Sequence, residues 1–339
     1  MTPDGNPDNS RGLNRTLAKL VGTGVAVAVL LLTLLGWYWT DEPGYLDLDD
    51  LVATHAGGRD VTGAATTSAL VGVAGTLLDK RGGYLSNDRF PPGVWLDNIP
   101  NWEFGVLVQV RDLSKAMRER FSRSQSQSQE DEDLSLAEPL FNFDSDSWML
   151  PATEGEYRAG IQHLESYLFR LTDDDRYNAQ FYARADNLRF WLSTVEGRLG
   201  SLSQRLTASV GQRRLNIDLA GETGGKQSAS TPAGEMIVKT PWYELDDVFY
   251  EARGTTWALV HFLRAIERDF DSVLDKKNAR VSLQQIIREL EATQAPLFSP
   301  VILNGTGFGL VANHSLVMAS FISRANAALI DLRSLLEQG

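Results

Sequence analysis

The first pattern in the chain is an uninterrupted apolar run near the amino terminus, from Leu20 to Thr40. The run holds 21 residues without a charge, and a helix needs about 20 to cross the ~30 Å hydrocarbon core of a bilayer. Its far end carries Trp37, Tyr38 and Trp39, and such amphipathic rings favour the headgroup layer. The pattern predicts a transmembrane helix over residues 20–40.

The charges on either side of this run predict its orientation. Arg11, Arg15 and Lys19 precede it, and the next basic residue after it is Arg59. Short basic flanks stay in the cytoplasm, so residues 1–19 are expected to form a cytoplasmic tail. A cleaved signal peptide is the alternative, but its apolar region spans about 7–15 residues and ends in a small-x-small site, which this run lacks. A buried core helix is disfavoured by the polar flanks.

Three later segments repeat apolar residues at alternating spacings of four and three. The first covers Glu154–Leu171, the second follows a polar turn and extends to about Val210, and the third begins near Leu245 and reaches Val273. This spacing is typical of long helices that pack side by side with knobs in holes. Further helices are expected over four other stretches: Thr62–Lys80, Trp102–Phe121, Ser282–Thr293 and about Leu310–Glu337.

Polar segments separate these helices. Residues 41–60 are acidic and punctuated by glycine and proline, which predicts a tether leading away from the membrane. Two stretches without apolar periodicity, near 122–135 and 211–240, are expected to be flexible loops. The second could hold a small hairpin formed by Leu215–Leu219 and Met236–Lys239.

Together these elements predict a mainly α fold. A single amino-terminal transmembrane helix is followed by an elongated bundle of long antiparallel helices over residues 61–339. Heptad spacing of this length is also compatible with a dimeric coiled coil. An intramolecular bundle is favoured because three such helices lie in one chain, with connections short enough to pair them.

Composition narrows the choice of partners and chemistry. The formal net charge is −12 and the chain contains no cysteine. An acidic surface repels nucleic acid and anionic headgroups, and without cysteine there are neither disulfides nor thiolate metal sites. We therefore expect no nucleic-acid partner. The expected partners are the bilayer, through Leu20–Thr40, and another envelope protein, with a homo-oligomer left open.

Common catalytic motifs are missing from the sequence. The four histidines lack the Glu-x-x-His and His-Glu-x-x-His spacings of metal helices. The stretch Ala220–Gln227 resembles a phosphate loop, but it lacks the first glycine and the final serine or threonine. There is no Gly-x-Ser-x-Gly elbow. No metal or cofactor is expected, and no catalytic residue is assigned. The acidic stripe Glu244, Asp247 and Glu251 is interpreted as a solvated flank or as partners of arginines on a neighbouring helix.

Several runs of sequence carry a family resemblance. They are Gly-Gly-Tyr-Leu-Ser-Asn-Asp at 82–88, Pro-Pro-Gly-Val-Trp at 91–95, Asn-Trp-Glu-Phe-Gly at 101–105, Asp-Val-Phe-Tyr-Glu-Ala-Arg-Gly at 247–254 and Asn-Gly-Thr-Gly-Phe-Gly at 304–309. Together they resemble the bacterial domain-of-unknown-function family numbered 2333 from about Asp60 to Gly339. The resemblance implies a Gram-negative inner membrane and a periplasmic body, and it implies no reaction.

Two segments are candidate binding sites. The aromatic, turn-rich stretch 84–102 is either a cap over one end of the bundle or an interaction surface, for which the residues are Arg89, Trp95, Asp97 and Trp102. The glycine-rich run before the last helix is either a tight turn or an anion or ligand loop, with Asn304, Gly305, Gly307, Gly309 and His314 as its residues. His314 is alternatively a core histidine.

Three functions fit these features. The preferred one is a non-enzymatic interaction or scaffold component of the cell envelope, because a membrane anchor and amphipathic helices occur without a recognisable catalytic set. The alternatives are a cell-wall hydrolase or lyase that uses unrecognised carboxylates, and a periplasmic ligand sensor that relies on a partner to pass the signal.

Overall fold

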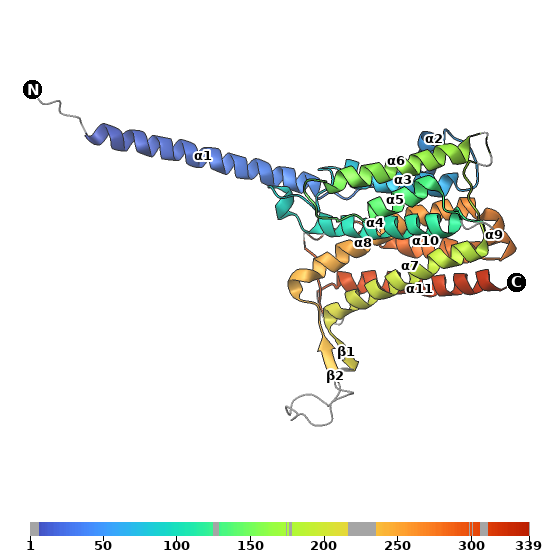
Figure 1. The fold of residues 1–339 in the computed structure, drawn as a ribbon. Helices are drawn as coiled ribbons and strands as arrows, with labels where there is room; N and C mark the ends of the chain where they lie inside the picture. The colour runs from blue at the N-terminus through green and yellow to red at the C-terminus, as the bar shows by residue number, and fades with distance from the viewer. Residues whose placement is uncertain are drawn as a thin grey trace, which may run out of the picture.

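The computed structural model describes residues 7–124, 129–173, 175, 178–215, 235–297, 299, 301–305 and 311–338. Figure 1 shows one long helix, α1 (Pro7–Trp39), projecting from a body built of helices that lie side by side. From Leu17 to Trp39 this helix has a mean hydropathy of 2.2, and only 6% of it is buried. The predicted apolar helix is therefore confirmed as a helix, and most of its length is exposed.

The helices of the body fall into three groups in Figure 1. One group is α3 (Ala64–Asp79), α5 (Glu132–Phe141) and α6 (Thr153–Thr172), with the short α2 (Leu48–His55) beside α3. The central group is α4 (Asn98–Ala116), α8 (Leu245–Asp269) and α10 (Arg280–Ala292), and the third is α7 (Ala185–Thr207) with α11 (His314–Glu337). The mainly α prediction is confirmed.

Short elements connect these helices. Helix α4 runs on into a π-helical turn, and α8 breaks at Phe270 before α9 (Asp271–Lys276), so the third predicted helix is interrupted rather than continuous. Two strands, β1 (Gln212–Leu215) and β2 (Glu235–Val238), pair antiparallel. The second strand overlaps the predicted Met236–Lys239, whereas the first shares only Leu215 with the predicted Leu215–Leu219, of which residues 216–219 lie outside the described residues. Short turns within the described residues are 3₁₀ turns at Gly93–Trp95, Ala208–Val210 and Trp242–Glu244, and the π-turn at Met117–Phe121.

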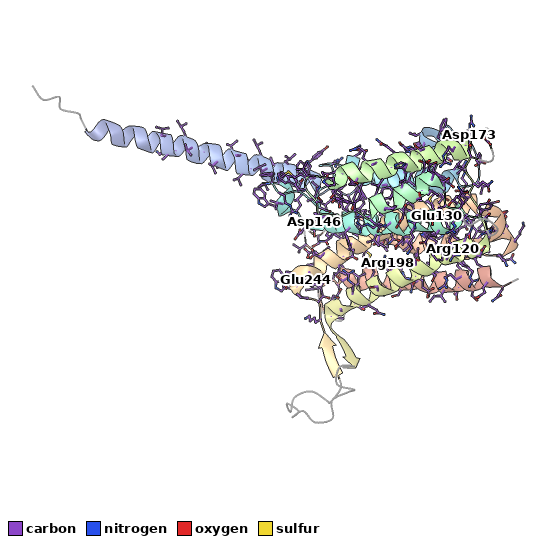
Figure 2. The ribbon with its side chains drawn as sticks, in the orientation of Figure 1. Arg120, Glu130, Asp146, Asp173, Arg198 and Glu244 are labelled. Atoms are coloured by element: carbon purple, nitrogen blue, oxygen red, sulfur yellow. The ribbon has the colours of Figure 1, made fainter. Side chains whose placement is uncertain are left out.

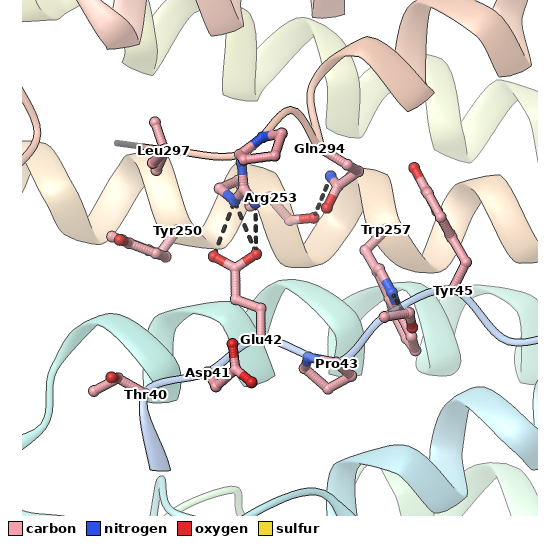
Figure 3. A pocket seen from close by; sticks show the side chains of 12 residues that line it. Thr40, Asp41, Glu42, Pro43, Tyr45, Tyr250, Arg253, Trp257, Gln294 and Leu297 are labelled. Atoms are coloured by element: carbon pink, nitrogen blue, oxygen red, sulfur yellow. Dashed lines mark hydrogen bonds and ion pairs between the residues drawn. The ribbon is translucent and has the colours of Figure 1, made fainter. Parts of the chain in front are cut away.

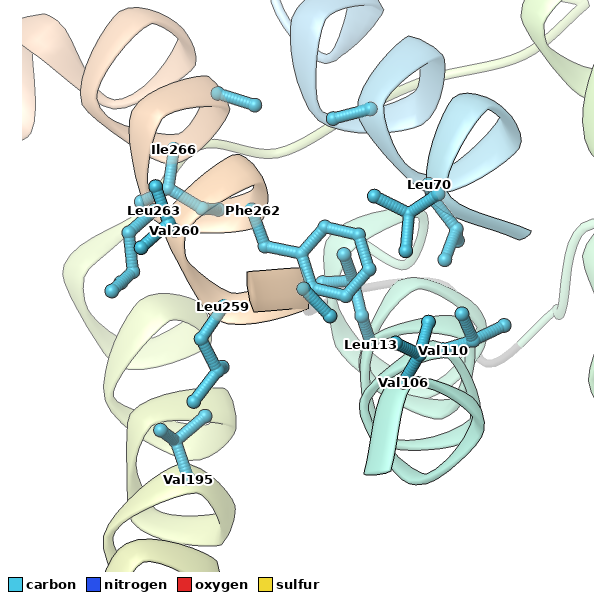
Figure 4. Close-up of a cluster of buried hydrophobic side chains, with 14 of the residues drawn as sticks. Leu70, Val106, Val110, Leu113, Val195, Leu259, Val260, Phe262, Leu263 and Ile266 are labelled. Carbon is cyan, nitrogen blue, oxygen red and sulfur yellow. The ribbon is translucent and has the colours of Figure 1, made fainter. Parts of the chain in front are cut away.

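The core lies where α8 meets α3, α4 and α7 (Figure 4). It consists of branched aliphatic and aromatic side chains with no exposed area, and burial of each such side chain contributes roughly 1.5–3 kcal/mol. Helix α11 also has the length and composition of a membrane span, but 39% of it is buried and it packs against α7 and α10. The core side chains in Figure 4 include Leu70, Val106, Val110, Leu113, Val195, Leu259, Phe262 and Ile266.

Two polar segments are more ordered than expected. The predicted loop near 122–135 contains the start of α5, because the Asp131 carboxylate accepts hydrogen bonds from the amides of Asp133 and Leu134 and caps the helix. Arg170 of α6 pairs with the carboxylates of Asp131 and Asp133, at 2.8 and 2.6 Å. The predicted tether at 41–60 includes α2 and packs against the body. Residues 125–128 and 216–234 of the two predicted loops lie outside the described residues.

Candidate functional site

The predicted interaction surface at 84–102 is only partly a surface. Trp95 is 54% exposed, and Arg89 is exposed and donates to the Asp146 carbonyl at 2.9 Å. Asp97 caps α4 by accepting from the Asn98 amide. Trp102 is fully buried, so its assignment to a surface was wrong: it lies in the first turns of α4 and faces inward.

The segment before α11 forms a turn that closes on itself. The amide of Gly305 donates to the Ala312 carbonyl at 3.1 Å, and Asn304 forms an isolated bridge with Asn313. The ring of His314 accepts a hydrogen bond from the Leu303 amide at 3.1 Å, so this half-buried histidine has a structural partner. Gly307 and Gly309 lie outside the described residues. The ligand interpretation stays a prediction.

A different set of residues forms a polar site with several charged and backbone contacts, at the point where α1 joins the bundle. The segment 40–47, here called the strap, leaves α1 and crosses α8 (Figure 3). Glu42 of the strap pairs with the nearly buried Arg253 of α8, whose Nε lies 2.9 Å from both carboxylate oxygens and whose Nη2 lies 2.7 Å from one. The remaining Arg253 nitrogen donates to the carbonyls of Thr293 and Ala295 at 3.1 Å.

This arrangement joins three distant parts of the chain through one guanidinium group. Arg253 connects the strap, α8 and the carboxyl end of α10, and each of its three nitrogens donates to at least one acceptor. Charge-assisted, bidentate bonds of this kind are among the strongest polar contacts in proteins. The strap is therefore fixed to the body and is not a free tether.

Two further backbone contacts hold the strap against α8. The indole nitrogen of Trp257 donates to the Gly44 carbonyl at 3.2 Å, and the Leu46 amide donates to His261 Nε2 at 2.9 Å. His261 Nδ1 lies 2.8 Å from the Trp257 carbonyl and must carry the proton there, because a carbonyl only accepts. The buried imidazole is thus held neutral, and burial lowers the pKa of His261 to about 4.

The state of His261 predicts a pH dependence of stability. Because its folded pKa of about 4 is below the unfolded value of 6.5, the unfolded chain binds this proton first. The free energy of unfolding should fall as the pH drops from 6.5 towards 4, by up to about 3 kcal/mol from this residue. Urea unfolding of the full-length protein in detergent should show a weaker pH dependence for His261→Gln than for the parent chain.

The control for this prediction is His163→Gln, because His163 is partly exposed and pairs with Asp133 at the surface of α6. We expect this variant to keep the parent's loss of stability between neutral and acid pH. Equal pH profiles for His261→Gln and the parent would contradict the assignment of a neutral, strap-binding imidazole.

Beneath the strap, α4 and α8 approach each other with almost no side chains between them. A methyl group on Gly254 would overlap the carbonyl oxygen of Trp102, and one on Gly105 would overlap that of Glu251. On either side of this contact, the rings of Trp102 and Trp257 lie 5.1 Å apart, and the Thr255 hydroxyl donates to the Gly105 carbonyl at 3.3 Å. Two glycines therefore set the distance between the central helices.

The same turn of α4 also contributes to a buried ion pair. Lys80 Nζ and Glu103 Oε1 are 2.5 Å apart, and both side chains are almost inaccessible to solvent. The Glu103 carboxylate also accepts from the amides of Leu85 and Ser86 and from the Ser86 hydroxyl, at 2.5–3.1 Å. Burial raises the pKa of Glu103, whereas the ammonium of Lys80 and these hydrogen bonds lower it.

The loop that follows Lys80 packs on the end of α1. Its two glycines, Gly82 and Gly83, have φ values of +85° and +73°, which glycine adopts without strain, and Gly82 lies against the ring of Trp39. Arg81 pairs with Asp41 and stacks over the Tyr38 ring at 4.9 Å. The Lys80–Glu103 ion pair thus stabilises the start of a loop that packs against the last turn of α1.

The next loop touches α1 one turn earlier. Gly36 is buried, and a Cβ there would lie 3.3 Å from Pro92 and 3.6 Å from Leu96. Contacts to α1 therefore come from the strap, from the loop after α3 and from the loop before α4. We call this assembly the anchor junction; its defining residues are Gly36, Glu42, Lys80, Glu103, Gly105, Arg253, Gly254, Trp257 and His261.

The anchor junction brings together three runs of sequence that are far apart in the chain. Glu103 and Gly105 belong to the run at 101–105, Arg253 and Gly254 to the run at 247–254, and Ser86 to the run at 82–88. Sequence reasoning missed their partners Glu42 and Lys80, which carry no motif. Of the acidic stripe, Glu251 pairs with Arg205 at 2.5 Å, and Asp247 accepts from Asn101 at 2.8 Å, as expected for a helix flank.

The fold and the anchor junction define the class of protein, which is a helical bundle joined firmly to an exposed, apolar amino-terminal helix. A family model described as an uncharacterised protein conserved in bacteria, DUF2333, matches residues 12–339. The chain belongs to this family, as its sequence runs indicated. No curated protein and no solved structure matches the chain.

Proposed function

We propose that this protein is a single-pass component of the bacterial inner membrane, and that its helical body is a non-enzymatic interaction or scaffold module held at the periplasmic surface. The proposal rests on the difference between the exposed apolar length of α1 and its last turn, which packs on the body. Most of the apolar length of α1 is exposed, whereas its last turn packs against the loops at Gly82 and Pro92, and the strap after it pairs with Arg253. An exposed helix of mean hydropathy 2.2 needs a lipid environment.

The orientation follows from charge. Arg11, Arg15 and Lys19 precede the apolar stretch, and acidic residues follow it, so the amino terminus is placed in the cytoplasm. Inside the body, consecutive long helices are proposed to alternate in direction, because short connections favour antiparallel neighbours. The long helices α8 and α10, which pack against each other, are joined by residues 270–279, which include the short α9.

A scaffold role is supported by the rigid attachment of the body. A free tether would let the body sample many orientations, whereas the strap and the two loops that contact α1 fix one orientation relative to the span. A fixed orientation presents the same surface to other envelope proteins at all times, which lowers the entropy cost of their binding.

Photo-crosslinking in the native envelope tests this role. A photoreactive amino acid at the exposed positions Phe169 or Val281 should give a discrete adduct with another envelope protein, and one at the buried Leu263 should not. Adducts formed solely between copies of this chain, or no adducts at several exposed positions, would contradict a scaffold role. Release of soluble peptidoglycan fragments by the purified protein would favour a hydrolase instead.

A further inference from the structure

Large apolar side chains are exposed on two loops beside the end of α1. Leu150 is 93% exposed, and its neighbours Trp148 and Met149 are exposed as well. The loop before α4 exposes Phe90, Val94 and Trp95. We call these six residues the membrane-end patch. Exposed apolar clusters of this kind mark binding surfaces for proteins or membranes.

Contacts between the two loops make the patch one continuous surface. The rings of Phe90 and Trp148 lie 5.7 Å apart in an edge-to-face arrangement, and Arg89 donates to the Asp146 carbonyl at 2.9 Å. A further hydrogen bond joins the two loops, because the side-chain amide of Asn87 donates to the Ser147 carbonyl at 3.0 Å. The exposed rings are therefore held in place and do not turn back into the core.

The position of the membrane-end patch relative to α1 indicates which binding partner contacts it. Pro92 and Leu96, which flank Val94 and Trp95, pack on Gly36. Gly36 lies three residues before the end of α1 at Trp39, which is about 5 Å along a helix that rises 1.5 Å per residue. This is the level at which the exposed Trp37 and Tyr38 of α1 would meet the headgroups.

A second pair of exposed aromatic residues lies at the same end of the body. Trp242 is 83% exposed and Tyr243 is also exposed, and both directly precede Glu244. In Figure 2, Glu244 and Asp146 are at the end from which α1 leaves, and Asp173 is at the opposite end. Exposed aromatic side chains thus occur at more than one place on this end of the body.

We propose that this end of the body inserts into the outer leaflet of the bilayer, with the membrane-end patch and Trp242 and Tyr243 reaching the headgroup layer. The inference rests on the proposed membrane anchorage of α1. Phospholipid is the occupant because the patch continues the surface of α1 at the level of its aromatic end. Such rings are amphipathic and favour this layer.

The charges around the patch define the kind of lipid contact. Within residues 84–97 and 142–152, which hold the patch, there are four acidic residues and one basic residue: Asp88, Asp97, Asp144 and Asp146 against Arg89. Polybasic segments attract anionic lipid, whereas this surface is acidic and repels it. Insertion is therefore driven by apolar area, and it should occur with zwitterionic lipid and persist at high salt.

Depth-dependent fluorescence quenching of the full-length protein tests the proposal. Because the chain has no cysteine, the single substitutions Val94→Cys, Leu150→Cys, Val281→Cys and Leu31→Cys each carry one environment-sensitive label. The proteins are reconstituted in phosphatidylcholine vesicles that contain lipid with a spin label near the headgroup or deep in the chain. Val281 is the matched control, an exposed valine in the first turn of α10 at the far end.

We expect the shallow quencher to reduce fluorescence at positions 94 and 150 at least about twofold more than at 281, with and without high salt. Equal quenching at 94, 150 and 281, while the label at 31 in α1 is quenched by the deep probe, would overturn the inference and leave the anchor intact. Absence of quenching at 31 would show instead that the anchorage itself fails.

Discussion

Gly254→Ala is expected to destabilise the body by at least about 3 kcal/mol. The added methyl group would overlap the Trp102 carbonyl of α4, and backbone atoms cannot move aside as a side chain can. The two central helices would have to separate, which would open the contact between Trp102 and Trp257. Urea unfolding followed by circular dichroism of the full-length protein in detergent measures the loss.

The matched control is Gly197→Ala in α7, where nothing lies within 4 Å of the added methyl group. Alanine is the better helix former, so this variant should be stabilised by up to about 1 kcal/mol. Gly105→Ala, whose methyl group would overlap the Glu251 carbonyl, should behave like Gly254→Ala. A parent-like stability for both junction variants would show that α4 and α8 do not approach as closely as described.

Glu103→Gln should cost about 3–5 kcal/mol, because it leaves the ammonium of Lys80 buried without its counter-charge. The variant keeps the size of the side chain but replaces one acceptor oxygen of a carboxylate that accepts from Leu85 and Ser86. Lys80→Met should cost a similar amount, since it leaves the carboxylate unpaired. Unfolding midpoints of the two variants in the same detergent give the values.

A double-mutant cycle separates the pair from its surroundings. Lys80→Met combined with Glu103→Gln should be clearly less destabilised than the sum of the single variants, because no unpaired charge remains. The control is Asp79→Asn, which removes the neighbouring exposed pair with Arg158 at 3.5 Å and should change stability by less than about 1 kcal/mol. Additive effects of the two junction variants would contradict a coupled ion pair.

The long helices and the apolar α1 could be predicted because their signals are local. A heptad pattern such as Leu188, Leu192, Val195 and Leu199 in α7 reports which face is buried without any knowledge of the neighbour. The same logic failed for α5. Its acidic start, Glu130–Asp133, was interpreted as a loop, although Asp131 is a helix cap and Leu134 and Ala137 face the core.

The anchor junction could not be predicted because its contacts are long-range. Glu42 and Arg253 are 211 residues apart, and no period or spacing links them. The prediction that Trp102 lies on a surface rested on the preference of aromatic residues for interfaces. In the structure Trp102 is buried instead, because Gly105 and Gly254 allow α8 to approach α4 closely. Glu103 gave no signal, because a buried carboxylate and an exposed one are identical in sequence.

The cysteine-free chain allows a direct test of the central claim, that α1 crosses the membrane and carries the body outside the cytoplasm. Single variants Val281→Cys in the body and Ser10→Cys before the apolar stretch are treated in spheroplasts with a maleimide that cannot cross membranes. We predict that position 281 reacts in intact spheroplasts and that position 10 reacts after lysis. Protection of position 281 until lysis would contradict the account.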